Sequence, residues 1–164
     1  MLEILREVER DLPDMLLDES SWRSLDVNYD QPRVERLYRQ HGENRIYLHR
    51  IHPCSTGQPL MHPHPWPSVV RVLSGLYEMG MGVNSDNTTP SVVVTLYFYG
   101  AGLYEMTDPA AWHYVRPLGG PSFSLMVAGP KWDRWAPSSS VPLQPLQADE
   151  IREIFEFFRS RYPK

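Results

Sequence analysis

Two histidines, His62 and His64, lie one residue apart in the stretch HPHPWP. In an extended strand, residues i and i+2 project to the same face, so the two imidazoles are expected to lie together. The proline that follows each histidine disfavours helical backbone at that histidine and favours an extended one. Imidazole binds zinc, copper, iron and nickel in proteins. The pair therefore predicts either two ligands of one metal ion or two partly exposed histidines in a proline-rich loop.

The prolines also restrict where this segment can lie. Pro63, Pro65 and Pro67 have no N–H group, and the missing donors would all fall on the same side of a strand. That side cannot pair with an ordinary neighbouring strand. We therefore expect the segment at the edge of a sheet or at the mouth of a barrel.

A third ligand has to come from another part of the chain. His113 lies in PAAWHYV, within a predicted strand. Taken alone, a histidine of this kind is more often a core or surface residue than a ligand. His49 and His52 are three residues apart, so they are expected on opposite faces of a strand and cannot both bind one ion. His41 lies in the polar stretch RQHGEN and is expected to be solvated.

The middle of the chain has the composition of β-strands. Apolar, β-branched and aromatic residues predict strands over residues 44–51, 69–83, 91–99, 102–107, 112–117 and 123–129. Ser74-Gly75 is a turn signal that divides 69–83 into two runs, and 91–99 is predicted to be buried. Many short strands separated by turns predict an all-β sandwich or barrel. Residues 18–44 are mostly polar and are expected to be irregular.

A helix is predicted at each end of the chain. Helical spacing of apolar residues indicates an amphipathic helix over residues 2–11, which Pro13 interrupts before a further turn to residue 17. A second apolar stripe predicts a helix over residues 148–162. That stripe consists of Ile151, Ile154, Phe155, Phe158 and Tyr162. Both helices are expected to pack on the outside of the β-structure.

Composition excludes several classes of protein. The 164 residues contain no low-complexity linker, which favours a single domain over residues 1–164. A net charge of −4 without a basic cluster argues against nucleic-acid binding. Cys54 is the only cysteine, so a disulfide within the chain is excluded and a reducing, cytoplasmic location is expected. No signal peptide or membrane-spanning apolar run is present, so no membrane association is expected.

The histidine pair and its flanking glycines resemble the first motif of the cupin superfamily. In that motif a glycine precedes an H-x-H pair, and a glutamate and a closing glycine follow it. Gly57, His62, His64 and Gly75 take these positions, while Ser68 stands in place of the glutamate. The second motif is matched more weakly, by Gly102 and His113. Asp108, Ala110 and Pro117 stand at its proline, glycine and asparagine positions.

The resemblance covers about residues 45–130. It implies a double-stranded β-helix, which is a jelly-roll barrel, over that range, with flanking helices in 1–17 and 148–162. It also implies that His62, His64 and His113 hold a divalent metal ion inside the mouth of the barrel. Fe(II) is favoured, with nickel, zinc and manganese as alternatives. The superfamily suggests a homodimer as well.

The function implied by the resemblance is that of a small-molecule oxygenase similar to the three-histidine dioxygenases. Three neutral imidazoles leave the charge of the ion uncancelled, so an anionic small molecule that chelates the metal is expected. Arg71 and Arg116 are candidates to hold a substrate carboxylate, with a solvent-facing role as the alternative. The stretch 123–129 lacks the histidine and tyrosine that thiol dioxygenases carry there, so cysteine is not predicted as the substrate.

Two other interpretations stay open. Nothing in the sequence demands a general base or a nucleophile, so a cupin that binds a small molecule or a metal without turnover is the first. The second is a β-sandwich interaction module whose histidines have no shared function.

Overall fold

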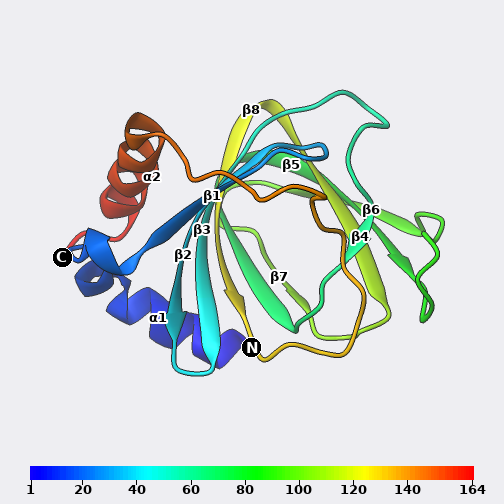
Figure 1. The fold of residues 1–164 in the computed structure, drawn as a ribbon, viewed down its shortest axis with the longest axis horizontal. Helices are drawn as coiled ribbons and strands as arrows, with labels where there is room; N and C mark the ends of the chain where they lie inside the picture. The colour runs from blue at the N-terminus through cyan, green and yellow to red at the C-terminus, as the bar shows by residue number, and fades with distance from the viewer.

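The computed structural model describes residues 1–164, which form one β-sheet, two α-helices and a short 3-10 helix (Figure 1). The helices are α1 (Leu2–Met15), η1 (Glu19–Ser21) and α2 (Ala148–Arg161). The strands are β1 (Arg23–Val27), β2 (Val34–His41), β3 (Asn44–Ile51), β4 (His62–Pro63), β5 (Ser68–Val83), β6 (Val94–Phe98), β7 (Leu103–Met106) and β8 (Ala111–Ala128). The predicted all-β class with a helix near each end is confirmed.

The strands form an antiparallel sheet in the order β1-β2-β3-β8-β5-β6, with β4 paired to β8 and β7 paired to β5. No ladder joins β1 to β6, so the sheet is open and not a closed hydrogen-bonded barrel. The sheet is strongly curled, and Figure 1 shows β4 facing β2 and β3 across the curl. As the prolines predict, β4 lies at an edge, because it pairs with β8 alone.

Both helices pack on the outer side of the curled sheet, as predicted (Figure 1). Leu5 and Leu12 of α1 and Phe155 and Phe158 of α2 are buried in one core with residues of the sheet. Burial of each such side chain contributes about 1.5–3 kcal/mol to the free energy of unfolding. No helix has the length and apolar character needed to cross a bilayer.

The prediction that Pro13 interrupts the first helix is wrong, although helical backbone does continue beyond it as expected. The helix α1 continues through Pro13 to Met15. Proline removes only its own N–H, and the bond from the amide of Leu16 to the carbonyl of Leu12 continues the helical pattern. Burial of Leu12 and Leu16 in the main core favours the helical backbone on both sides of the proline.

The prediction that residues 18–44 are irregular is also wrong. They contain η1, β1 and the whole of β2, so the sheet begins at Arg23 and not near residue 45. The composition is misleading because β2 carries charged residues on both faces. Glu35 is buried against arginines, and Arg36 lines a cavity. Charged side chains of this kind hide the alternation of apolar residues that identifies a strand.

The turn predicted at Ser74-Gly75 is a β-bulge within one long strand, β5. The pairing with β8 shifts register on either side of Ser74, and Gly75 has a φ of +83°. A Cβ atom at Gly75 would lie 2.5 Å from the Oγ of Ser122. A glycine there therefore bends the strand without ending it. In the same way, the two strands predicted within 112–129 are one strand, β8, which runs through Pro117 and Pro121.

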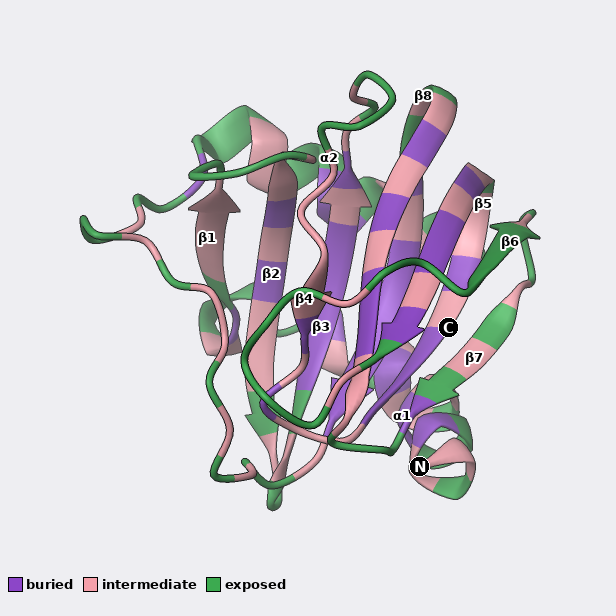
Figure 2. Cartoon of the chain, turned by 90° about the vertical axis from the view of Figure 1, so that its right-hand side faces the viewer, coloured by how far each residue is buried: buried purple, intermediate pink, exposed green.

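The strand predicted to be buried over residues 91–99 is instead exposed. The side chains of Tyr97 and Tyr99 are 56% and 67% exposed. β6 pairs only with β5, at the end of the sheet, and neither helix covers it (Figure 2). Its β-branched and aromatic residues indicate a strand but do not reveal whether another layer covers it.

Successive residues of the central strands alternate between two environments. On β3, Ile46 and Leu48 pack in the core beneath the helices. Tyr47 packs in a separate cluster within the curl, while His49 and Ile51 line a cavity there. The outer face of the sheet therefore anchors the helices, and the inner face surrounds the cavity.

Candidate metal centre

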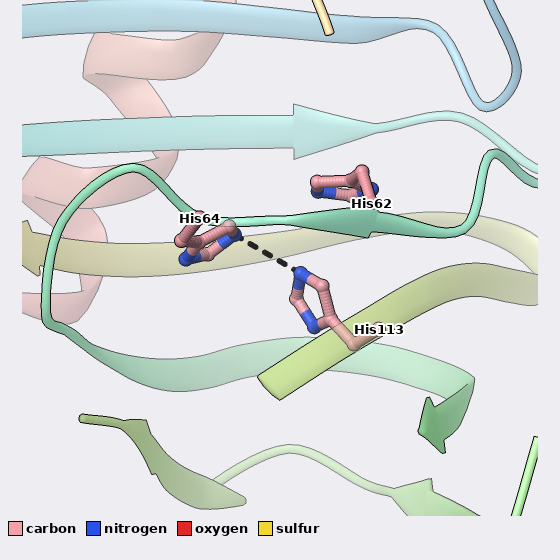
Figure 3. A group of neighbouring side chains, drawn as sticks. All are labelled: His62, His64 and His113. Carbon is pink, nitrogen blue, oxygen red and sulfur yellow. Dashed lines mark hydrogen bonds between the residues drawn. The ribbon is translucent and has the colours of Figure 1, made fainter. Parts of the chain in front are cut away.

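The three predicted ligands come together on the inner face of the sheet (Figure 3). His62 begins β4 and lies directly opposite His113 of β8 in the antiparallel register. His64 follows β4, and extended backbone directs its ring to the same side as that of His62. The Nε2 atoms of His64 and His113 are 3.0 Å apart. One ligand nitrogen from each of the three rings lies within 4.8 Å of the others.

Hydrogen bonds orient two of these rings for metal binding. The Nδ1 of His62 lies 2.9 Å from the carbonyl oxygen of Leu60. Because a carbonyl oxygen can only accept, this Nδ1 carries the proton and the Nε2 of His62 keeps its lone pair. The Nδ1 of His64 lies 2.8 Å from the Oγ of Ser68, which can accept its proton in the same way. Metal-binding histidines in proteins usually have their other ring nitrogen held in this manner.

Ser68 has a specific role in this arrangement. It stands at the position where the cupin motif has a glutamate ligand, and it is fully buried. Here the residue at that position does not belong to the three-ligand cluster but holds the ring of a ligand, His64.

The spacing of His64 and His113 fits ligation of one metal ion, and the ligand atom of His62 lies within 4.8 Å of both. Metal–nitrogen bonds of about 2.1 Å at a right angle place two ligand nitrogens about 3.0 Å apart. The Nε2 atoms of His64 and His113 have that separation. The Nδ1 of His113 is buried without a hydrogen-bond partner, and the polar contact of its Nε2 is with the Nε2 of His64. The residues present therefore fit a divalent ion held by three neutral imidazoles.

Burial keeps all three imidazoles neutral. It lowers the pKa of His64 to about 3 and the pKa of His113 well below its ordinary value. The pKa of His62 is lowered for the same reason. The neighbouring histidines lower the pKa of His64 and His113 further, because two positive rings would repel each other. Neutral imidazole is the form that binds metals, so the cluster is ready for an ion at neutral pH.

The histidines open onto a cavity of about 190 Å³ that includes residues of β2, β3, β5 and β8. Aromatic rings make up much of the wall near the histidines. Trp66 stacks on Tyr47, and Tyr104 lies edge-on to His113 with ring centroids 6.2 Å apart. The hydroxyl of Tyr104 accepts a hydrogen bond from the hydroxyl of Tyr77. Space for a small molecule therefore lies beside the three candidate ligands.

The arginines predicted to bind a carboxylate do not reach this cavity. Arg71 pairs with Glu9 of α1, and Arg116 pairs with Glu78 of β5. Neither lines the cavity. The prediction is wrong at these two positions because each guanidinium already has a carboxylate partner within the chain.

Two further inner-face residues line the cavity, His49 and Arg36, and of these the sequence analysis did not single out Arg36. They are directly opposite each other in the β2–β3 register. His52 instead points to the outer face and contacts Glu35, so the prediction that His49 and His52 lie on opposite faces is confirmed. Alternation along 44–51 identifies the face of His49, but only the pairing of β2 with β3 brings Arg36 beside it.

Comparisons of sequence gave no relative: no family model and no curated protein matches this chain. Comparisons of structure did. Hydroxypropylphosphonic acid epoxidase from S. wedmorenis matches with a TM-score of 0.52 and 10% identity, over 66% of this chain and 56% of that one. A structure of Fe(II)-HppE with the alternative substrate (S)-1-HPP matches with a TM-score of 0.54 and 11% identity, over the same shares. AerE from Microcystis aeruginosa matches with a TM-score of 0.51 and 17% identity, over 77% of this chain and 52% of that one.

This chain thus spans a little over half the length of the chain in each of these three structures. The likeness, at such low identity, concerns the fold. Together with the open, curled antiparallel sheet and the three converging histidines, it defines a cupin-type fold. The fold implied by the sequence motifs is confirmed.

Proposed function

We propose that this protein is a metal-binding cupin with small-molecule oxygenase activity. In this proposal His62, His64 and His113 hold a divalent ion, and Fe(II) is the favoured one. The observation that carries the proposal is the convergence of three neutral imidazole nitrogens on one point beside a cavity. A bound iron would supply Lewis-acid and redox chemistry.

Two further observations support iron and oxygenase chemistry. The solved structures that share the fold include an epoxidase and its Fe(II) form. The cluster itself contains no carboxylate, and three protein ligands leave coordination positions open. Open positions beside a cavity are what a substrate needs to reach a catalytic metal.

The residues of the chain would orient the metal and shield it. The carbonyl of Leu60 and the hydroxyl of Ser68 hold the rings of His62 and His64. Trp66 and Tyr104 provide apolar surface next to the rings, which limits the water near the site. In this proposal a small molecule fills the space beside the histidines, so that little water reaches the metal.

The first experiment measures metal binding. Protein purified without a histidine tag is analysed for its metal content, then stripped and titrated with Zn(II) and Fe(II) under anaerobic conditions. We expect one divalent ion per chain. His113→Ala should weaken binding by more than about 100-fold, since loss of an outer partner alone costs 10–100-fold. His41→Ala is the matched control, because it removes a histidine of β2 that lies outside the cavity.

The second experiment measures turnover. Oxygen consumption by the Fe(II)-loaded protein is followed with a panel of thiols, diketones and hydroxy acids. Consumption that depends on one class of compound and is lost in His113→Ala supports the proposal. A stoichiometric metal with no consumption on any compound favours the alternative, a cupin that binds a small molecule or a metal without turnover. A wild-type protein that binds no metal overturns the oxygenase proposal and leaves only the small-molecule form of the alternative.

A further inference from the structure

The cavity contains a second cationic group, the guanidinium of Arg36, whose charge no residue of the chain neutralises. Arg36 projects from β2 to the inner face and lines the same cavity as the three histidines. Its Nε donates a hydrogen bond to the Nε2 of His49, at 3.1 Å. Its guanidinium also lies over the ring of Tyr47, 5.0 Å from the ring centroid.

None of these contacts supplies negative charge. Burial lowers the pKa of His49 well below its ordinary value, so His49 is a neutral acceptor. Burial also lowers the pKa of Arg36, and no carboxylate offsets that effect. Arginine nevertheless stays protonated in proteins, so the side chain remains a cation.

Arg39 and Arg134 also have no carboxylate partner, but each donates a hydrogen bond to a backbone carbonyl oxygen. Four other arginines held within the fold differ from Arg36 more strongly. Arg33, Arg50, Arg71 and Arg116 each form an ion pair with at least one carboxylate. Removing a charge from water is unfavourable unless a partner compensates it. The one acidic residue of the cavity wall, Asp30, is exposed, and its carboxylate accepts a bond from the backbone of Gln31. The terminal N–H groups of Arg36 donate to no protein atom.

We propose that Arg36 binds the carboxylate of a small acid whose other oxygen faces the three histidines. This inference deepens the proposed function, on which it rests, by naming the substrate class: short-chain hydroxy or oxo acids. A guanidinium presents paired N–H donors that match the two oxygens of a carboxylate. An ion on three neutral imidazoles would attract the same acid, so both cations of the cavity favour one ligand. A cavity of about 150 Å³ holds benzene, so about 190 Å³ suits an acid of similar or slightly greater size.

The test compares anion binding by the wild-type protein and Arg36→Met, each loaded with Zn(II), which does no redox chemistry. Lactate, acetate and malonate are the probes, and affinities are measured by calorimetry. Lactamide, which resembles lactate but has no charge, reports on shape alone. We expect Arg36→Met to weaken lactate binding by about 10-fold or more, because hydrogen bonds between charged groups are the stronger ones. Arg36→Lys should fall between the two proteins, and lactamide should not distinguish them.

Arg45→Met is the matched control. It removes an arginine of β3 that stacks on Tyr38 and does not line the cavity. It changes the net charge by the same amount, so its lactate affinity should equal that of the wild-type protein. Zn(II) affinity, measured on the same samples, should be unchanged or greater in Arg36→Met, because a nearby positive charge is removed.

The outcomes separate this inference from the metal proposal. Equal affinity of wild-type and Arg36→Met for the three acids overturns the inference and leaves the metal centre intact, provided that Zn(II) binds. Absence of acid binding by both proteins overturns it as well. If Zn(II) does not bind, the same titrations on metal-free protein still decide the role of Arg36, and the metal proposal fails by itself.

Discussion

Glu35 and Arg36 are neighbours on β2, and their side chains lie in two very different charged environments. On the outer face, the carboxylate of Glu35 is 1% exposed and contacts Arg33, Arg50 and His52. Arg33 and Arg50 also pair with Glu150 and Glu153 of α2, so the network joins the sheet to the helix. On the inner face, Arg36 and the histidines form a cluster of cationic and neutral groups without a buried carboxylate. The outer face of β2 therefore has charges that balance within the chain, whereas the inner face has a positive charge that no carboxylate balances.

The difference indicates which charges serve folding and which serve binding. A balanced network is complete within the chain and can contribute to stability. An unbalanced cluster does not stabilise the folded state, because its charged groups lose water without gaining a partner of opposite charge. In the proposal above, a bound anion compensates the charge of these groups. Substitutions on the outer face should therefore change stability, and substitutions on the inner face should change binding.

The largest effect is expected from the outer face. Glu35→Ala should lower the free energy of unfolding by about 3–5 kcal/mol, the usual range when one partner of a buried ion pair is removed. Denaturant unfolding of metal-free protein measures this. Glu153→Ala is the control, because Glu153 is 57% exposed and contacts only Arg50, so its loss should stay under about 1 kcal/mol. Equal losses from the two substitutions would contradict the distinction between a buried and a peripheral member of the network.

A smaller effect, and one on binding, is expected from Ser68→Ala. The substitution removes the hydroxyl that holds the ring of His64, so affinity for Zn(II) should fall by about 10–100-fold. Ser122→Ala is the control, because its buried hydroxyl makes no hydrogen bond and its loss should leave Zn(II) affinity unchanged. A Ser68→Ala protein that binds Zn(II) as tightly as the wild type would show that Ser68 does not orient the ligand.

The smallest effect concerns pH. His49 is held neutral because burial lowers its pKa, whereas the unfolded chain takes up a proton near the ordinary value of 6.5. The unfolded state therefore binds more protons as the pH falls, and the free energy of unfolding decreases. Between pH 7.5 and 5.5, His49 should account for a loss of about 1.4 kcal/mol. His49→Gln should remove that part of the pH dependence in metal-free protein, and parallel stability curves for the two proteins would argue against a buried neutral His49.

Several features of the fold follow from local sequence patterns. The apolar stripe of 148–162 is helical in the structure, and the extended backbone imposed by Pro63 and Pro65 places His62 and His64 on one side. Local patterns are less reliable where long-range pairing determines the outcome. Ser74-Gly75 has the composition of a turn, but the register with β8 turns it into a bulge. The run 91–99 has the composition of a core strand, but its position at the end of the sheet leaves it exposed.

The sequence by itself predicted a helix near each end, the strands after residue 44, the shared side of His62 and His64 and the two helical faces that pack on the sheet. Each of these depends on the conformation of a few consecutive residues and the periodicity of their side chains. Only the tertiary structure decided that His113 completes the cluster, because the pairing of β4 with β8 joins segments far apart in the chain. It also decided that Glu35 has cationic partners and Arg36 has no anionic one. Adjacent residues of a strand share an extended backbone but project to opposite faces. The segments that pack on each face therefore determine which partners each side chain has.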